Sequence, residues 1–255
     1  YGIQCITFLK NVFVLHGTGV GGGSLVYANT LLVPSDKAFK DKRWIGDGWK
    51  KKLMPFYAIA KKMLGANEAK FLGESDYLIK DIADDLGRGD TFCKVNVGVF
   101  FDSPGKNVKD PYFDGKGPDR KGCILCGECM TGCRHNSKNT LDKNYLYLAE
   151  KNGVEITPER EVVYVRKDKE DYIVKCKKST GVLRKTEFFR ANKIIFSGGV
   201  MGTVKLLFKC KAKGYLKNLS HQLGNYVRTN SESILGVRSR KIAKEIDLTK
   251  GIAIS

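Results

Sequence analysis

The stretch that most constrains this chain is a run of glycines near its N-terminus. Residues 12–29 read VFVLHGTGVGGGSLVYAN, with glycine at five of the seven positions from 17 to 23. Glycine permits backbone conformations with positive φ and has no Cβ to hold a ligand away. Successive backbone N–H groups at the start of a helix bind anions, and the helix dipole favours phosphate there. The run therefore predicts a phosphate-bearing cofactor that lies against the backbone.

The spacing Gly17-x-Gly19-x-x-Gly22 formally fits the dinucleotide-binding fingerprint. That fingerprint also needs an acidic residue about 20 positions further on, at the end of a second strand. Asp41 is near that distance, but it lies in a loop-like stretch rich in Lys and Asp. We therefore expect a second glycine-rich contact to a cofactor of this kind, rather than the primary fingerprint. A tight strand–helix crossing without a ligand stays open as the alternative.

Four of the eight cysteines form a run, Cys123-x2-Cys126-x2-Cys129-x3-Cys133. This spacing resembles the bacterial ferredoxin run that holds a [4Fe–4S] cluster, although Arg134 stands where the ferredoxin pattern has proline. A four-cysteine zinc site is the second interpretation. A set of packed or redox-active thiols without metal is the third, and the residues alone leave all three open. The clustering favours a reducing compartment over a disulfide framework.

The composition is that of an ordinary soluble globular protein, with 255 residues, 42% hydrophobic and 28% charged. Lys and Arg number 45 against 27 Asp and Glu, which gives a formal net charge of +18. The basic residues are spread along the chain, so we expect a basic surface and no nucleic-acid partner. No apolar run approaches the ~20 residues of a membrane span. We see no signal peptide and expect a cytoplasmic protein.

Hydrophobic periodicity predicts the elements around these two motifs. A buried strand should precede the glycines, and helices should follow them, the second capped by Ser75. A long functional loop should lead to the cysteines, and a three-stranded antiparallel meander and a strand–glycine-turn–helix unit should come last. The ranges are 12–15 (strand), 53–64 and 75–86 (helices), 92–101 (strand), 102–122 (loop), 141–149 (helix), 161–166, 172–177 and 183–189 (meander), and 193–196 with 203–209 (strand and helix).

Four blocks, in order, resemble the glucose–methanol–choline (GMC) oxidoreductases, and most closely the cholesterol-oxidase-like branch of that family. They are GTGVGGGSLVYAN (17–29), CGECMTGCRHNSKNTLDKNYLYLAE (126–150), IIFSGGVMGTVKLL (194–207) and LGNYVRTNSE (223–232). Together they span nearly the whole chain.

The resemblance implies an α/β (α+β) fold. It is an incomplete FAD/NAD(P)-binding Rossmann-like domain with an inserted antiparallel β-meander and an interleaved substrate domain. We expect residues 1–35 to belong to the FAD-binding domain and 36–120 to form a helical and loop cap on the substrate side. Residues 121–215 would contain the cysteine cluster, a helix, the meander and a second part of the FAD-binding domain. Residues 216–255 would begin the substrate-binding domain.

The resemblance also implies the cofactor and its contacts. The glycine run would lie along the pyrophosphate and ribityl of FAD, and the residues after it near the isoalloxazine. A meander strand would reach the adenine through its backbone. A later glycine pair would form a further flavin-side turn, and an asparagine near the end would reach toward the flavin and substrate cavity. In order, these residues are Gly19, Val20, Gly21, Gly22, Gly23, Ser24, Tyr27, Ala28, Asn29, Val162, Gly198, Gly199 and Asn230.

The implied activity is oxidation of a CH–OH group of a hydrophobic alcohol or sterol, with hydride transfer to FAD and electrons passing on to dioxygen or a redox partner. The family's N-terminal fingerprint and its catalytic histidine region have no counterpart here, so we expect an interior fragment of a longer enzyme. His16, His135 and His221 lack a partner at nucleophile–base spacing, and no catalytic residue is assigned. The alternative is a non-catalytic iron–sulfur or flavin electron-transfer subunit.

Overall fold

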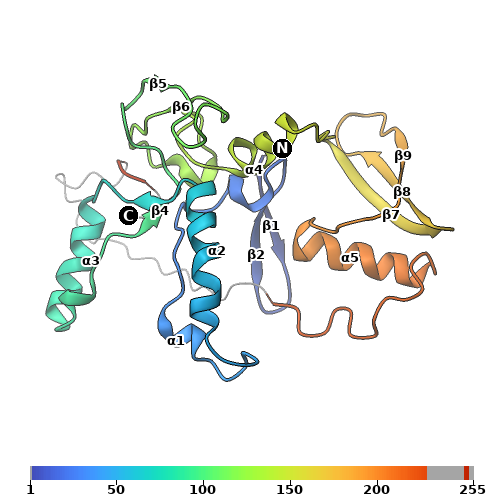
Figure 1. The fold of residues 1–255 in the computed structure, drawn as a ribbon, viewed down its shortest axis with the longest axis horizontal. Helices are drawn as coiled ribbons and strands as arrows, with labels where there is room; N and C mark the ends of the chain where they lie inside the picture. Colours follow the sequence, from blue (N-terminus) through green and yellow to red (C-terminus); the bar gives the residue numbers. More distant parts are fainter. Residues whose placement is uncertain (1, 229–249, 253–255) are drawn as a thin grey trace. The chain divides into compact units, whose positions relative to one another are not determined.

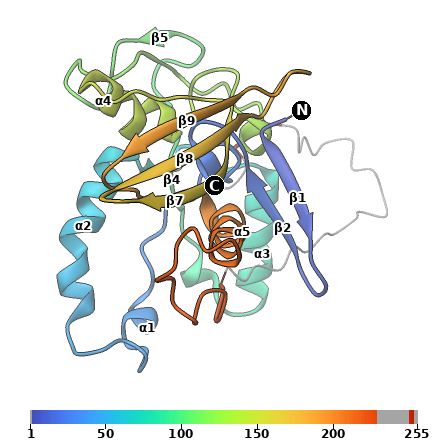
Figure 2. The ribbon, with the colours of Figure 1, turned by 90° about the vertical axis from the view of Figure 1, so that its right-hand side faces the viewer.

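The computed structural model describes residues 2–228 and 250–252. It divides the chain into two compact units, residues 1–155 with 239–255 and residues 156–238. Figures 1 and 2 show a mixture of helices and short antiparallel strands in the described part, which agrees with the mixed class predicted. The four predicted domain segments stay predictions.

The first unit begins with a hairpin of β1 (Gln4–Phe8) and β2 (Phe13–Gly17). We predicted a buried strand over 12–15; the strand is present, but its burial and its first residue were predicted wrongly. The strand starts one residue later, and Phe13 and Leu15 expose 52% and 37% of their surface. Side chains alternate between the two faces of a strand. Within the described residues, only one face of this two-stranded ribbon is packed, so every second apolar side chain is exposed.

Three helices follow in the first unit: α1 (Asp36–Phe39), α2 (Trp49–Met63) and α3 (Glu74–Asp85). The two longer helices were predicted, and Gly65 ends α2 with a φ of 59° as expected. The predicted cap of α3 was wrong. Gly73 precedes the helix, and its backbone N–H donates to the carboxylate of Asp76 at 2.7 Å, so the helix begins before Ser75.

The core of the first unit is small and contains a member of the cysteine run. Cys129 is buried with Ala69, Val97, Val99 and Ile252. The predicted strand 92–101 shrinks to β4 (Asn96–Val97), which pairs with β3 (Asn67–Glu68). The next residues leave the ladder because Phe100 N–H bonds to the carbonyl of Ser137 instead.

The long loop 102–122 is ordered by one carboxylate. Asp110 accepts backbone N–H groups from Tyr112, Phe113 and Gly117 at 2.9–3.1 Å. Short strands β5 (Asn107–Val108) and β6 (Arg120–Lys121) pair at the base of the loop.

The helix predicted over 141–149 is a 3-10 turn (Leu141–Lys143) followed by α4 (Tyr145–Lys151), which is capped by Asn144.

The second unit is the predicted meander, packed on one helix. β7 (Arg160–Asp168), β8 (Asp171–Lys178) and β9 (Thr186–Ala191) form one antiparallel sheet in that order. Helix α5 (Gly199–Ala212) lies against β7 (Figures 1 and 2), and the Cys210 sulfur accepts the backbone N–H of Val165 at 3.4 Å.

The strand predicted over 193–196 is absent from the described residues, where this stretch is irregular and Ile195 is 89% exposed. A short apolar run becomes a buried strand only where neighbouring strands pair with it. The strands of the described part pair antiparallel, so the parallel Rossmann sheet stays a prediction. No helix of the described part is long and apolar enough to cross a bilayer.

Candidate functional site

The glycine run forms a tight loop that leads into a single 3-10 turn, Gly22–Leu25. Gly19, Gly21 and Gly22 have φ values of 135°, 106° and 53°, a region that favours glycine. A Cβ on Gly17 would lie 2.4 Å from the carbonyl oxygen of Gly22, so the loop folds back closely on the end of β2. The local sequence therefore fixes the loop without help from a ligand.

Gly23 differs from these glycines. It is exposed, its φ lies outside the left-handed region, and a Cβ added there would meet no atom within 4 Å. Packing and backbone strain therefore do not require glycine at position 23. A molecule lying against the loop would require it, and the open backbone here is the kind of cradle that a phosphate chain needs.

Residues 138–141 hold the glycine loop in place. Ser24 Oγ donates to the carbonyl of Gly21 at 2.7 Å and accepts the backbone N–H of Leu141 at 2.9 Å. The Tyr27 hydroxyl donates to the carbonyl of Asn139 at 2.8 Å. Burial raises the pKa of Tyr27, so its hydroxyl keeps its proton and remains a donor.

Asn29 is the most unusual residue of the predicted cofactor stretch. It is fully buried, its φ is 74°, and both its amide oxygen and its amide nitrogen lack a hydrogen-bond partner in the described part of the chain. The neighbouring hydroxyl of Thr30 is also buried without a partner there. An unpaired buried polar group costs about 1–3 kcal/mol. Two adjacent ones fit a site whose partner is a bound molecule, so residues 17–30 fit a flavin-type cofactor.

The other predicted contacts fall in the second unit. Val162 lies on β7 beside a register shift in the ladder, where Val162 and Tyr164 have neighbouring partners on β8. Gly198 precedes α5, and Gly199 begins it with a φ of 71°. Asn230 lies outside the described residues. The structure thus gathers Gly19 to Asn29 in one loop, and Gly198 and Gly199 in one helix start, while the FAD contacts of all these residues stay predictions.

Lys138 was not predicted, although it lies within the second resembling block. Its side chain is buried, and its Nζ donates to the carbonyls of Leu25 at 3.0 Å and Cys129 at 2.7 Å. The Nζ also lies 4.6 Å from the centre of the Tyr27 ring. Burial lowers the pKa of Lys138 to about 8. This lysine joins the glycine stretch to the cysteine run, which no sequence spacing could reveal.

Arg120, on β6, is the second buried cation that sequence patterns missed, because it lies at the end of a stretch without periodicity. Its guanidinium donates to the carbonyls of Asn136 at 3.1 Å and Lys138 at 2.8 Å, and to the side chain of Asn139. It also lies over the Tyr112 ring at 5.7 Å. Burial lowers the pKa of Arg120, while nearby charges and its acceptors keep the cation in place. Arg120 therefore positions the segment that holds the glycine loop.

The four cysteines of the run line one cavity of about 10 Å³. That is roughly the space that a single water needs, so the side chains would have to move apart to hold an eight-atom iron–sulfur cluster. Burial raises the pKa of Cys123 to about 11. Burial also acts on Cys133, but backbone N–H groups outweigh it and lower that pKa. The [4Fe–4S] ligand set stays a prediction.

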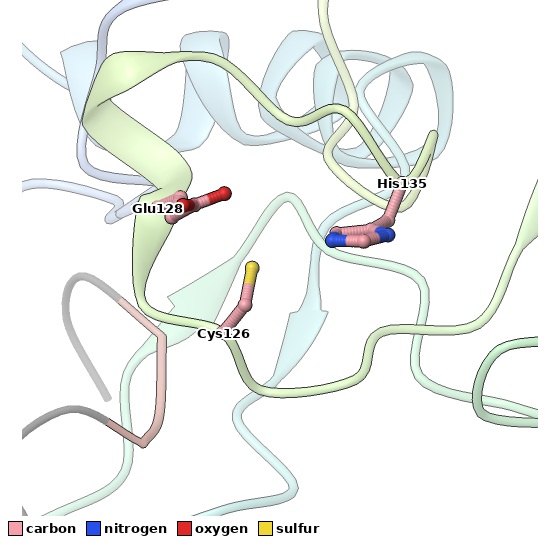
Figure 3. A group of neighbouring side chains, drawn as sticks. All are labelled: Cys126, Glu128 and His135. Atoms are coloured by element: carbon pink, nitrogen blue, oxygen red, sulfur yellow. The ribbon is translucent and has the colours of Figure 1, made fainter.

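A different group at this cavity has the spacing of metal ligands. The Cys126 sulfur, a Glu128 carboxylate oxygen and a His135 ring nitrogen all lie within 4.8 Å of one another. Figure 3 shows the Cys126 side chain pointing into the space between Glu128 and His135. The sequence placed His135 next to the cysteines without a role, and Glu128 was missed. His16, by contrast, forms a hydrogen bond within the β1–β2 hairpin, where its Nε2 lies 3.0 Å from Thr7 Oγ1.

Comparison with known proteins identifies the family of the chain. The GMC oxidoreductase family profile matches residues 117–223, which include the cysteine run, the meander and all of α5. A cholesterol oxidase of Mycobacterium tuberculosis is 46% identical over 264 aligned residues, which cover 100% of this chain and 46% of that protein. A cholesterol oxidase of Acinetobacter baumannii is 42% identical over 267 residues, covering 100% of this chain and 48% of that protein. The chain belongs to the GMC oxidoreductase family.

Membership of the GMC family confirms the resemblance predicted from the four motif blocks. The glycine stretch 17–29 lies outside the profile match but inside the alignment with both oxidases, which covers the whole chain. This GMC chain spans about half the length of the curated relatives it matches, 46% and 48% of them.

Proposed function

We propose that this chain supplies the flavin-contacting loop of an FAD-dependent oxidoreductase that oxidises the CH–OH group of a bulky hydrophobic alcohol of the sterol class. Membership of the GMC family and the likeness to two proteins named cholesterol oxidase support the reaction and the substrate class. The structural observation that supports it most is the loop 17–30. It combines an open glycine backbone at Gly23 with the buried, unpartnered amide of Asn29.

The chain's own residues have distinct parts in this proposal. The N–H groups of Gly22 and Ser24 donate to the carbonyls of Gly19 and Gly21. The other backbone N–H groups between Gly19 and Ser24 would hold the phosphates, as the start of a helical turn does for anions. The amide of Asn29 can both donate and accept a hydrogen bond, and it would orient the isoalloxazine edge. Lys138 would hold a positive charge behind the loop through its bonds to Leu25 and Cys129. FAD itself, when bound, supplies the acceptor for the hydride of the alcohol.

Dioxygen is the electron acceptor we propose, because both relatives are named oxidases. The alternative of a non-catalytic electron-transfer subunit receives no support from the relatives. A redox partner as acceptor remains an outcome of the test below.

Anaerobic reduction of the full-length protein tests this function. A sterol with a free 3-hydroxyl should bleach the oxidised-flavin absorbance, and admitting air should restore it and produce one hydrogen peroxide per sterol oxidised. The matched control is the same sterol acetylated at that hydroxyl, which has no CH–OH group to oxidise and should leave the spectrum unchanged. Protein that contains FAD and is reduced by no alcohol would overturn the proposed reaction. Bleaching by the sterol without reoxidation by air would overturn only the proposal that dioxygen is the electron acceptor.

A further inference from the structure

The cavity beside the cysteine run has no part in the proposed flavin chemistry. We propose that Cys126, Glu128 and His135 bind one divalent cation of the zinc class. The three residues supply a thiolate, a carboxylate and an imidazole around a common point (Figure 3).

The geometry fits a single ion. Zinc lies about 2.0–2.3 Å from its sulfur, nitrogen and oxygen ligands, so the donors of one tetrahedral ion are about 3.3–3.8 Å apart. The three donor atoms of this group lie within 4.8 Å of one another and would draw together by about 1 Å to bind the ion. The cavity of about 10 Å³ that Cys126, Glu128 and His135 line has room for one ion.

The donor chemistry selects the metal class. A thiolate and an imidazole favour zinc and similar borderline ions over magnesium and calcium, which prefer oxygen ligands. Cys123, Cys129 and Cys133 line the same cavity, so a fourth donor is close at hand. A three-ligand zinc site with an open fourth position is equally familiar chemistry.

The backbone presents these donors on a fixed loop. Gly127, with a φ of 70°, turns the chain from Cys126 into the 3-10 turn Glu128–Thr131. Gly251 clamps the same turn, because its N–H donates to the carbonyl of Leu125 at 2.8 Å and its carbonyl accepts the N–H of Gly127 at 3.0 Å. The site is therefore held in place by contacts that do not depend on a metal.

The donors are also accessible. In the described part of the chain, no hydrogen bond engages the Cys126 sulfur or the His135 ring, and all three side chains are half-buried. Arg134 donates to both carboxylate oxygens of Glu128 at 3.0 Å, but the arginine side chain is 72% exposed. Exposed ion pairs contribute about 0–1 kcal/mol, far less than a structural zinc, so Arg134 does not block binding.

Metal analysis together with cobalt titration tests the proposal. Full-length protein purified without added metal is assayed for zinc, iron and acid-labile sulfide. Protein stripped with a chelator is then titrated with Co²⁺, a spectroscopic substitute for zinc whose thiolate complexes absorb in the near ultraviolet. We expect one zinc-class metal per chain, no sulfide, and a thiolate-to-cobalt band that saturates at one equivalent.

Single substitutions then assign the ligands. Cys126→Ser, Glu128→Gln and His135→Ala should each weaken Co²⁺ binding by more than about 100-fold, because loss even of outer contacts costs about 10–100-fold. The matched control is Cys93→Ser, an exposed cysteine outside the run, which should bind as the unaltered protein does. Should Cys126→Ser fail to fold, His135→Ala provides the same test at a half-buried loop position.

Three results would overturn the proposal. They are four irons with sulfide per chain, the absence of any bound metal after both assays, and a cobalt band that survives the loss of Cys126 or His135. None of these results bears on the flavin loop, whose cofactor content is measured separately.

Discussion

At the residue scale, Asn29 and Arg120 show opposite solutions to the burial of a polar group. Arg120 meets acceptors of its own chain, two carbonyls and the side chain of Asn139. The side-chain amide of Asn29 meets no partner in the described part. The backbone of Asn29 is held in place, because its backbone carbonyl accepts the N–H of Gly98 at 2.9 Å. Arg120 is therefore expected to serve stability, and Asn29 a ligand.

Replacing Asn29 with glycine separates these roles. Glycine keeps the φ of 74° without strain and removes the whole side chain, with its amide. We expect the apoprotein to keep its stability while the Kd for FAD rises about tenfold, or ~1.4 kcal/mol, the value of one good hydrogen bond. Fluorescence titration with FAD gives the Kd. The control is Ser103→Gly, an exposed residue with a φ of 52°, and equal FAD affinity in both variants would refute the role of Asn29.

Replacing Arg120 with methionine should lower the free energy of unfolding by about 3 kcal/mol, because it strands buried acceptors that the guanidinium satisfies. Urea denaturation followed by circular dichroism measures this. Arg43→Met is the control, since Arg43 is 91% exposed in its pair with Asp41 and should cost less than about 1 kcal/mol. A loss at Arg120 no larger than that at Arg43 would show that the buried bonds do not stabilise the fold.

At the element scale, the second unit depends on how α5 packs against β7. Cys210 is fully buried in the last turns of α5, and its sulfur accepts the N–H of Val165. Beyond α5, the Tyr215 carbonyl accepts the N–H of Lys167, and its ring lies 4.8 Å from that of Tyr164. These contacts tie the second half of β7 to the helix and to the segment that follows it.

Cys210→Ala should therefore loosen this packing. Loss of the sulfur leaves a small cavity and an unpaired N–H, at a cost of about 1–2 kcal/mol. Amides of α5 should exchange with deuterium about 5–30 times faster, as that cost implies when exchange occurs through unfolding. Cys93→Ala, at an exposed position, is the matched control and should leave α5 exchange as it was. Unchanged exchange in the Cys210 variant would contradict the anchoring role.

The sequence predicted the elements whose signal is local. Periodic apolar residues marked α2 and α3, alternation and polar turns marked the meander, and Gly65 marked a helix end. It failed where partners lie far away in the chain. The apolar run 193–196 has no strand to pair with in the described part, and residues 98–101 turn toward 137–139 instead of extending β4. Glu128 and His135 meet only because a turn fixed by Gly127 and Gly251 brings them together, and no spacing rule reveals that.

At the scale of the whole molecule, fold stability should depend on the cofactor. A ligand that binds only the folded state stabilises it by RT ln(1 + [L]/Kd), about 2.7 kcal/mol at 100 times Kd. Family membership and the open loop both lead to FAD as that ligand. Position 23 tests this most cleanly, because glycine there is required neither by packing nor by backbone strain.

The decisive measurement is the stabilisation of Gly23→Ala by FAD. The alanine should leave the apoprotein as stable as before, because its Cβ meets no atom within 4 Å. It should weaken the binding of FAD by tenfold or more. At an FAD concentration of 100 times the original Kd, stabilisation should then fall from about 2.7 to about 1.4 kcal/mol or less. Gly2→Ala, where the nearest atom is 4.0 Å away, is the control and should keep the full effect. Full FAD stabilisation in Gly23→Ala, equal to that of Gly2→Ala, would contradict the claim that this loop holds the flavin.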